Sequence, residues 1–407
     1  MASYKNTKQK IINDPLYGFI TISSPLLFDL IEHPIFQRLR HISQTGLSYL
    51  VYPGAHHTRF HHSLGCMYLM QKALNTLKQK GVEISQEEEE GACIAILLHD
   101  IGHGPFSHAL EHSIIEVHHE EISLYLFNQL NKEFNGALDL AIQIFKGEYH
   151  RGFFKQLISS QLDVDRLDYL MRDSFYTGVA EGTISIDRLI SMMNVVDDEI
   201  VIEAKGIYSV EKFIIARMFM YWQVYLHKTG VGAEYLLTKI LKRAHELYHN
   251  NFEIWTTPEL EFFFKRKIKF DDLNEEVMKH FLMLSDADIW ICIKQWSKSK
   301  DEILAKISKM LLNRNLYKVE ETEKEQLKDY FLEELNLSPE IIKNEYFSGI
   351  IPVKNLAYDK ENPIKLLMKN GRIIRLEEVS KQLDFKVLSK PVKKHYFCYL
   401  KRNHNKF

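Results

Sequence analysis

The residue types best suited to catalysis gather in one stretch, from Ile94 to His108. It reads IAILLHDIGHGPFSH, an apolar run that ends at His99 and Asp100 and is then broken by glycines and a proline. An imidazole beside a carboxylate offers one borderline and one hard ligand, a mixture that suits a catalytic divalent transition metal better than calcium or a structural zinc. Because one dipeptide cannot hold a metal alone, further ligands must come from elsewhere in the chain.

Two other places in the chain offer such ligands. Ten of the 19 histidines lie between residues 56 and 119, and His62 follows an Arg-Phe pair there. Asp165 and Asp168 share a helical face at spacing i, i+3, while Asp163 is placed to cap their helix. A carboxylate-rich helix start is usually only a cap. The concentration of histidines at predicted helix ends nevertheless favours a metal site.

Hydrophobic periodicity predicts helices around nearly all of these residues. Ser85 and Glu88 form a capping box for the helix that ends at His99, and another helix is predicted to begin at His118. A hairpin is expected around residues 197–208. These elements predict a mainly all-α protein whose helical catalytic core spans residues 1–335, with the metal site within residues 56–175.

The pattern of apolar, charged and turn-forming residues changes towards the C-terminus. The charged stretch from Val319 to Asp329 reads as a solvated helix face or a connector. Asn370-Gly371 lies between two apolar runs and is a strong hairpin signal, and residues 394–400 form a third apolar run. We therefore expect a small α+β appendage over residues 336–407.

Composition excludes several classes of protein. The 407 residues carry a formal net charge of -2, so no bulk polycation is present to bind nucleic acid, which nothing else in the sequence indicates. The four cysteines are widely separated and predict no disulfide scaffold. No apolar run approaches the ~20 residues of a membrane helix, and no signal core is visible. A cytoplasmic protein without membrane contact is expected.

Four motifs, taken in order, resemble those of the HD-domain phosphohydrolases. They are RFHHSLG from Arg59, the HDIGHGPFSH run from His99, the pair His119-Glu120, and DVDRLDY from Asp163. The closer resemblance is to the branch that contains the SAM-and-HD-domain deoxynucleoside triphosphate triphosphohydrolase and its bacterial relatives. It extends from about residue 10 to about residue 312, and no SAM domain is expected.

The resemblance implies the identity of the metal ligands and the reaction. One divalent transition metal, which can be Fe, Mn, Zn, Ni or Co, would be held by His62, His99, Asp100 and Asp165, and Mg²⁺ can accompany the nucleotide. Positions left open for water and a phosphate oxygen suit metal-assisted hydrolysis. The family reaction releases a deoxynucleoside and intact triphosphate from a deoxynucleoside triphosphate.

The same positional match implies roles for other side chains. His108 would protonate the leaving 5′ oxygen with Glu111 as its partner, where the family enzyme has aspartate, and His103 and His119 would contact phosphate. The implied substrate-binding residues include four cations for the polyphosphate and four groups at the sugar: Arg59, Arg166, Arg217 and Lys228; Gln44, Tyr169, Asp173 and Tyr225. Tyr225 would reject a ribose 2′ hydroxyl by crowding. For Arg217 and Lys228, an ordinary amphipathic helix face is an equal alternative.

A further match concerns regulation and assembly. A guanine nucleotide activator, GTP or dGTP, would bind at positions matched by Lys10, Ile11, Asn13, Glu32, Gln37 and Arg40, and would join subunits into a homo-oligomer, a dimer or a tetramer. The acid at Glu32 would accept from guanine N1 and N2. The alternative is that Gln37 and Arg40 are packing residues of a first helix.

Two other functions remain open from the sequence. One is a phosphomonoesterase or phosphodiesterase that acts on another nucleotide with the same metal, although a single phosphate does not need four cations. The other is a nucleotide-sensing or nucleic-acid-binding scaffold with a structural HD site, against which the intact ligand set argues.

Overall fold

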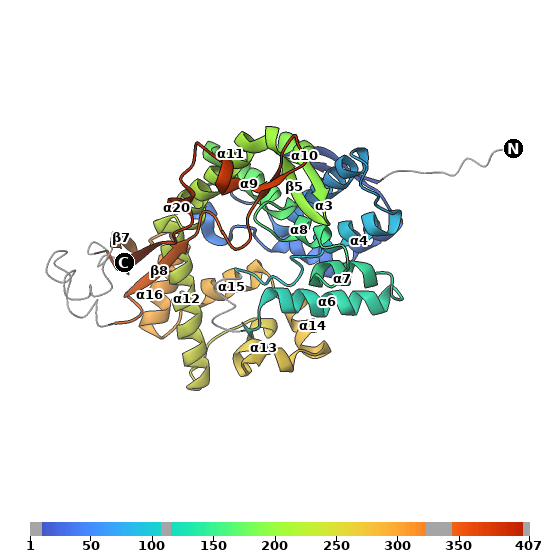
Figure 1. The fold of residues 1–407 in the computed structure, drawn as a ribbon. Helices are drawn as coiled ribbons and strands as arrows, with labels where there is room; N and C mark the ends of the chain where they lie inside the picture. Colours follow the sequence, from blue (N-terminus) through green and yellow to red (C-terminus); the bar gives the residue numbers. More distant parts are fainter. Residues whose placement is uncertain (1–9, 107–114, 323–343, 402–407) are drawn as a thin grey trace.

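Helices make up most of the part of the chain that the computed structural model describes, residues 10–106, 115–322 and 344–401 (Figure 1). The helices are α1 Pro25–Glu32, α2 Pro34–Gln37, α3 Arg59–Gln79, α4 Gln86–Leu97, α6 His119–Glu133, α7 Asp139–Lys146, α8 Phe153–Ile158, α9 Val164–Thr177, α10 Ile186–Met192, α11 Ile207–Met220, α12 Lys228–His249, α13 Pro258–Lys265, α14 Glu275–Met283, α15 Asp286–Trp296, α16 Glu302–Leu312, α19 Leu376–Val379 and α20 Phe385–Leu388. None of these described helices combines the length and apolar character needed to cross a membrane. The prediction of a mainly helical fold is confirmed.

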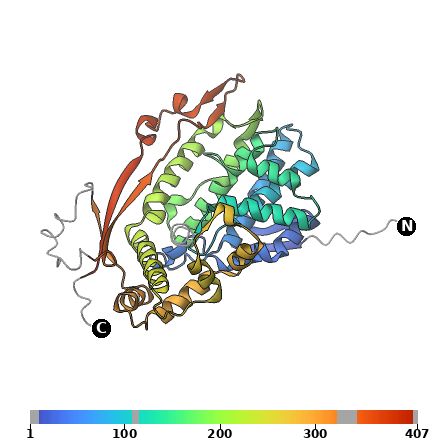
Figure 2. The same ribbon diagram turned by 90° about the horizontal axis from the view of Figure 1, so that it is seen from below.

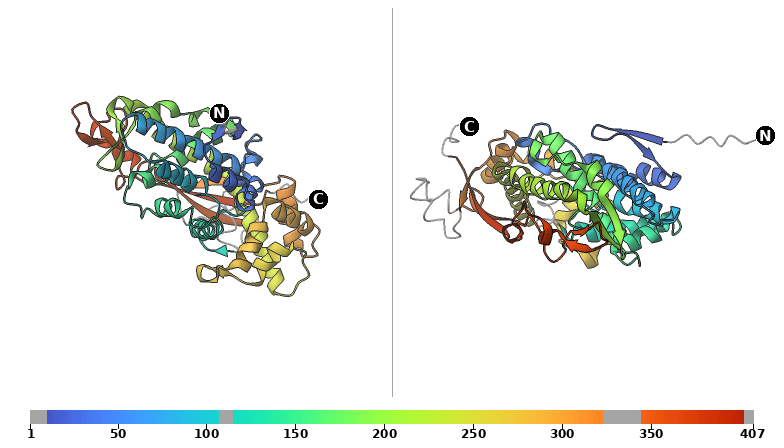
Figure 3. Two further views of the ribbon diagram at one scale, coloured as in Figure 1. Left: turned by 90° about the vertical axis from the view of Figure 1, so that its right-hand side faces the viewer. Right: turned by 45° about the horizontal axis from the view of Figure 1, so that its top comes forward.

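Strands form small sheets at the edges of this helical body. They are β1 Lys10–Asp14, β2 Gly18–Ile22, β3 Ile115–Glu116, β4 Met193–Val196, β5 Glu199–Glu203, β6 Ile268–Lys269, β7 Lys318–Thr322, β8 Ser348–Asn355, β9 Lys365–Leu367, β10 Ile373–Arg375 and β11 Val392–Tyr399. The sheet orders are β1-β2, β10-β9-β5-β4, β7-β11-β8 and β3-β6. The β1–β2 hairpin and the C-terminal strands lie at opposite edges of the molecule (Figure 3).

Three helices at the centre of the fold carry, or lead directly into, three of the four motifs noted in the sequence. Helix α3 packs against both α4 and α9 and buries apolar side chains such as Leu64 and Met67. The predicted capping box at Ser85 starts α4, and the Asp163 side chain accepts a hydrogen bond from the Arg166 amide to start α9, so both predicted caps are confirmed. The three motifs therefore converge where these helices meet.

The C-terminal strands lie along the outside of the helical body, where β8 and β11 form a long arm (Figure 2). The hairpin predicted at Asn370-Gly371 is present as β9–β10, and Gly371 has the positive φ that such a turn requires. Strand β9 also pairs in parallel with β5, so the appendage continues a sheet of the core. The division at residue 335 remains a prediction.

Two expectations for local structure need correction. The stretch from residue 319 begins as strand β7, because Lys318–Thr322 pairs with β11 along its length; the helix or connector predicted there is wrong for these residues. The hairpin expected over residues 197–208 begins earlier, with its turn at Asp197–Asp198 between β4 and β5. In both cases the pairing partner, which local sequence does not reveal, decides the outcome.

Gly102 follows the His-Asp pair and packs against the backbone of α6. A Cβ atom here would lie 2.1 Å from the His119 carbonyl oxygen and 2.4 Å from the Ser123 nitrogen, and neither backbone atom can retreat. We predict that Gly102→Ala lowers the free energy of unfolding by about 1–3 kcal/mol, measured by chemical denaturation. Gly230→Ala is the control, because a Cβ there meets nothing within 4 Å; a destabilised Gly230→Ala with an unaffected Gly102→Ala would contradict this packing.

Candidate metal centre

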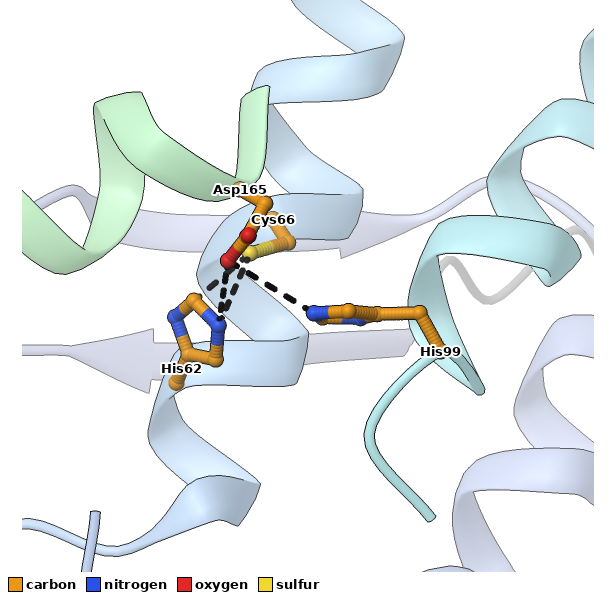
Figure 4. A group of neighbouring side chains, drawn as sticks. All are labelled: His62, Cys66, His99 and Asp165. Atoms are coloured by element: carbon orange, nitrogen blue, oxygen red, sulfur yellow. Dashed lines mark hydrogen bonds and ion pairs between the residues drawn. The ribbon is translucent and has the colours of Figure 1, made fainter. Parts of the chain in front are cut away.

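Two histidines and an aspartate from three different helical segments meet in the interior. The Asp165 Oδ1 atom lies 3.0 Å from Nε2 of His62 and 3.6 Å from Nε2 of His99 (Figure 4). His62 comes from α3, His99 from the turn that follows α4, and Asp165 from the first turn of α9. These three predicted ligands therefore direct nitrogen and oxygen atoms at a common point.

Asp100, the fourth predicted ligand, is buried beside this point. Its Oδ1 atom lies 3.4 Å from His99 Nε2 and 3.3 Å from His103 Nε2, and its Oδ2 atom lies 2.5 Å from a guanidinium nitrogen of Arg59. The separation from His62 Nε2 is longer, at 3.9 Å. Asp100 therefore adjoins the cluster and also pairs with the guanidinium group of Arg59 at the edge of the cluster.

Hydrogen bonds on the far side of each imidazole set its orientation. His62 Nδ1 lies 2.8 Å from Asp168 Oδ2, and His99 Nδ1 lies 2.7 Å from the Ile96 carbonyl oxygen. Because a carbonyl and a carboxylate only accept, each Nδ1 must carry a proton, so Nε2 is the ring atom left to bind a metal. This is how outer partners commonly prepare a histidine to bind a metal.

Asp168 is itself held by a buried arginine. Arg172 is fully buried and donates to both Asp168 carboxylate oxygens, at 2.9 and 3.0 Å, and to Asp14 at 2.8 Å. The close approach requires Gly65 on α3, since a Cβ atom there would lie 1.9 Å from Asp168 Oδ1. The glycine of the first motif therefore admits the acid that orients His62.

The loop that bears the His-Asp pair is fixed from two sides. Arg38 is buried and donates to the His103 carbonyl oxygen at 2.8 Å, while the Ser123 hydroxyl donates to the His99 carbonyl oxygen at 2.9 Å. The Gly102 amide donates back to the same hydroxyl at 3.0 Å. Sequence analysis missed Arg38 and Ser123, because neither stands near the motif along the chain.

The donor set fits a divalent cation. His99 Nε2 is buried and has no hydrogen-bond partner among the described residues, as expected for an atom that binds a metal. Burial alone would lower the pKa of His62, but its hydrogen bonds to the carboxylates of Asp165 and Asp168 outweigh this effect and hold the pKa well above its usual value. The carboxylates around His62 therefore favour a positive charge at this point, which a bound cation would supply.

Cys66, one turn along α3 from His62, is a neighbour that sequence analysis did not consider. With His62, His99 and Asp165 it forms a group whose ligand atoms all lie within 4.8 Å of one another. Burial raises the pKa of the Cys66 thiol, so it stays neutral and is a poor ligand compared with the carboxylate of Asp100. The ligand set His62, His99, Asp100 and Asp165 remains our prediction.

Other residues predicted around the metal are only partly described. His103 and His119 stack with their ring centroids 3.9 Å apart, beside Asp100. His108 and Glu111 lie outside the described residues. The structure thus brings the two predicted phosphate-contacting histidines together next to the cluster.

A cavity of about 530 Å³ opens beside the cluster. Five predicted substrate-binding residues line it: Gln44, Arg59, Tyr169, Asp173 and Tyr225. The Tyr225 hydroxyl donates to Asp173 Oδ2 at 2.6 Å, and His57 Nε2 lies 2.6 Å from Asp173 Oδ1. Sequence analysis missed His57, although its place two residues before Arg59, inside the histidine-rich stretch, was a signal.

The other predicted cations are placed differently. Arg166 and Arg217 line a second, more polar cavity of about 760 Å³ against the C-terminal segment. Arg217 is buried and donates to the carbonyl oxygens of Ala357 and Gln161, at 2.5 and 3.4 Å. Lys228 is the first residue of α12 and lines neither of these two cavities. The structure therefore does not bring all four predicted cations to one place.

The six residues matched to an activator site all lie within the first 40 residues of the chain. Lys10, Ile11 and Asn13 are exposed on β1, Glu32 is exposed as the last residue of α1, and Arg40 is exposed in the short helical turn Arg38–His41 that follows α2. Gln37 donates to the Ile31 carbonyl oxygen at 2.7 Å and accepts from Arg40 at 2.7 Å. These contacts match the packing alternative for Gln37 and Arg40.

Two family models match consecutive parts of the chain. The HD domain model matches residues 59–173, which contain every predicted metal ligand, and the HD associated region model matches residues 184–259. An uncharacterized protein of Bacillus subtilis, YwfO, is 34% identical over 397 residues, which cover 93% of this chain and 88% of that protein. The chain belongs to the HD-domain family of phosphohydrolases.

Two further relatives of this HD protein are named for an enzymatic activity. A phosphohydrolase of known structure from Bacteroides thetaiotaomicron is 48% identical, with a TM-score of 0.90 over 97% of this chain and 100% of that one. The SAMHD1 homologue of Dictyostelium discoideum, a deoxynucleoside triphosphate triphosphohydrolase, is 31% identical over 78% of this chain and 61% of that protein. HD domains bind divalent metals, in agreement with the cluster described above.

The geometry predicts that Asp168 sets metal affinity although it is not a ligand. We expect Asp168→Asn to weaken metal binding about 10–100-fold, because the amide no longer supplies a negative charge to His62 Nδ1. Chelator competition measures the affinity, and circular dichroism checks the fold. Asp187→Asn is the control, since Asp187 is 87% exposed; equal affinity in a folded Asp168→Asn protein would contradict the argument.

Proposed function

We propose that this protein hydrolyses deoxynucleoside triphosphates to a deoxynucleoside and inorganic triphosphate. One divalent transition metal would be held by His62, His99, Asp100 and Asp165. The main observation in support of the proposal is the position of Arg59, which pairs with Asp100 and also lines the cavity that contains Asp173 and Tyr225. Metal ligands, a phosphate-binding cation and a nucleoside-sized space thus adjoin one another.

The chain's own residues would orient the substrate for attack at the α-phosphate. Arg59 would bind a phosphate oxygen, since its guanidinium reaches both the cluster and the cavity. His103 and His119 would contact phosphate from the other side of Asp100. A bound transition metal supplies a hydroxide nucleophile near neutral pH and Lewis-acid polarisation of the phosphoryl group.

Proton transfer to the leaving group belongs to residues outside the described part of the chain. His108 would protonate the 5′ oxygen, with Glu111 to orient it, because a histidine with a carboxylate partner suits general acid work near pH 7. Arg166 and Arg217 would extend the polyphosphate site along the second cavity, and Lys228 would contribute from the start of α12.

The sugar would be held by groups that are already organised. Asp173 receives hydrogen bonds at both carboxylate oxygens, from His57 and Tyr225, so its position is fixed before substrate binds. Each oxygen retains a lone pair for the 3′ hydroxyl. Gln44 and Tyr169 would bind the same hydroxyl, and Tyr225 would stack near the sugar ring.

A regulated assembly forms part of the proposal. GTP or dGTP would bind at the site of Lys10, Ile11, Asn13, Glu32, Gln37 and Arg40 and would favour a homodimer or homotetramer. Mg²⁺ would accompany the nucleotide. Activation would then follow from linkage, since a nucleotide that binds the oligomer more tightly stabilises it.

Product analysis tests the reaction. Each of the four deoxynucleoside triphosphates is incubated with the protein and Mn²⁺ or Fe²⁺, with and without GTP, and products are separated by anion exchange. We expect deoxynucleoside plus triphosphate, more of both with GTP, and none after chelation or in the Asp165→Ala protein. Mononucleotide products would identify another phosphoesterase, and tight nucleic-acid binding without turnover would identify a scaffold.

Discrimination against ribonucleotides should depend on the ring of Tyr225. We predict that Tyr225→Ala reduces the ratio of kcat/KM for a deoxynucleotide over its ribonucleotide by about tenfold or more, since the crowding of the 2′ hydroxyl is lost. Tyr225→Phe keeps the ring and loses only the hydrogen bond to Asp173, so its ratio should stay near that of the wild type. Equal ratios in all three proteins would exclude crowding by this ring.

A further inference from the structure

Three polar groups on the wall of the substrate cavity have no partner among the described residues. Gln44 Oε1 and Thr45 Oγ1 are buried without a hydrogen bond. Glu234, on α12, lines the same cavity, and its half-buried carboxyl group makes no hydrogen bond or ion pair within the described part of the chain. Because a polar group without a partner is unfavourable once water is excluded, a ligand that fills this cavity must offer hydrogen-bond partners to these groups.

The position of Glu234 on the cavity wall suits contact with the base of the substrate. The cavity wall includes Arg59 beside the metal cluster and Asp173 at the predicted sugar site. Glu234 Oε1 lies against the backbone of Gly46, 3.3 Å from where a Cβ atom of that residue would stand. The remaining wall is largely apolar and suits a flat ring, with Phe106, Leu226, Val231 and Val353 among its residues.

We propose that Glu234 recognises the hydrogen-bonding edge of the base and makes this protein favour guanine over thymine. The inference rests on the function proposed above, because it assigns a base to the same cavity. An ionised carboxylate offers two acceptors, which match the N1–H and N2–H donors of guanine. Thymine instead places carbonyl oxygens on both sides of its single N3–H, so one of them would face a carboxylate oxygen.

The protonated carboxyl group has a different preference. It offers one donor and one acceptor, which match the amino group and ring nitrogen of adenine or cytosine. Burial raises the pKa of Glu234 to about 7, so both forms exist near neutral pH. The preference for guanine over adenine should therefore increase as pH rises through about 7.

The other titratable groups on the cavity wall do not alter this pH dependence. They are Arg59, Tyr169, Asp173, Tyr221 and Tyr225. Burial raises the pKa of Tyr169 and of Tyr225 well above the usual value, so both stay neutral in this range. Arg59 and Asp173 act at the metal site and the sugar, which are common to all four substrates. Their contribution to kcat/KM is therefore the same for each substrate and cancels in the ratio of two kcat/KM values.

The experiment measures kcat/KM for dGTP, dATP, dCTP and dTTP at pH 6 and pH 8, with saturating GTP so that any activator site is filled. In the wild type, the dGTP-to-dATP ratio should increase at least about fivefold from pH 6 to pH 8. In Glu234→Gln, whose amide has one donor and one acceptor at either pH, this ratio should not change with pH. At pH 8 the dGTP-to-dTTP ratio should fall at least about fivefold from wild type.

Glu253→Gln is the matched control, because Glu253 is exposed just beyond the end of the same helix. Turnover with ratios that are independent of pH in the wild type, or unchanged in Glu234→Gln, would overturn the role of Glu234 and leave the proposed function intact. If no triphosphate is released, the proposed function fails. Equilibrium binding of the four triphosphates to the metal-free protein, compared between wild type and Glu234→Gln at both pH values, then decides the role of Glu234.

Discussion

The buried ion pair between Asp168 and Arg172 is the interaction on which the metal centre depends. Both side chains are fully buried, and Arg172 also bonds Asp14 at the end of β1. A buried pair of this kind is held by mutual compensation, because removing one partner leaves an uncompensated charge and destabilises a protein by about 3–5 kcal/mol. Both residues lie on α9, and Arg172 joins this helix to the N-terminal hairpin through Asp14, while Asp168 places a carboxylate against His62. One electrostatic constraint therefore shapes the fold and prepares a ligand.

The rest of the site is arranged outwards from that constraint. Asp168 orients the imidazole of His62, and the Ile96 carbonyl orients that of His99, so both Nε2 atoms are directed at Asp165 before any cation binds. Asp100 extends the cluster to Arg59, whose guanidinium reaches the cavity. Negatively and positively charged groups therefore alternate from Asp168 to the cavity wall. A phosphate anion beside Arg59 and the metal would continue this alternation.

Local sequence predicted the parts of the structure that local interactions decide. The caps at Ser85 and Asp163 are formed within one helical turn, and the turn at Asn370-Gly371 needs only two residues with suitable φ. Motif order was enough to identify the family and to select the four residues that we predict as ligands. Contacts between distant segments were not accessible in this way. His57 reaches Asp173 across 116 residues, and strand β7 exists because β11 lies beside it.

The C-terminal segment shows how such distant contacts change the meaning of a residue. Sequence resemblance made Arg217 a phosphate ligand, yet its guanidinium donates to Ala357 and Gln161. The Gln161 side chain in turn donates to the carbonyl oxygens of Asp359 and Asn362 and accepts from the Asp359 amide. Gln161 stands two residues before the cap of α9, so these bonds connect the outer segment to the helix that carries Asp165. The segment is therefore part of the framework that positions a predicted metal ligand, and the guanidinium of Arg217 stabilises that framework whether or not it also meets phosphate.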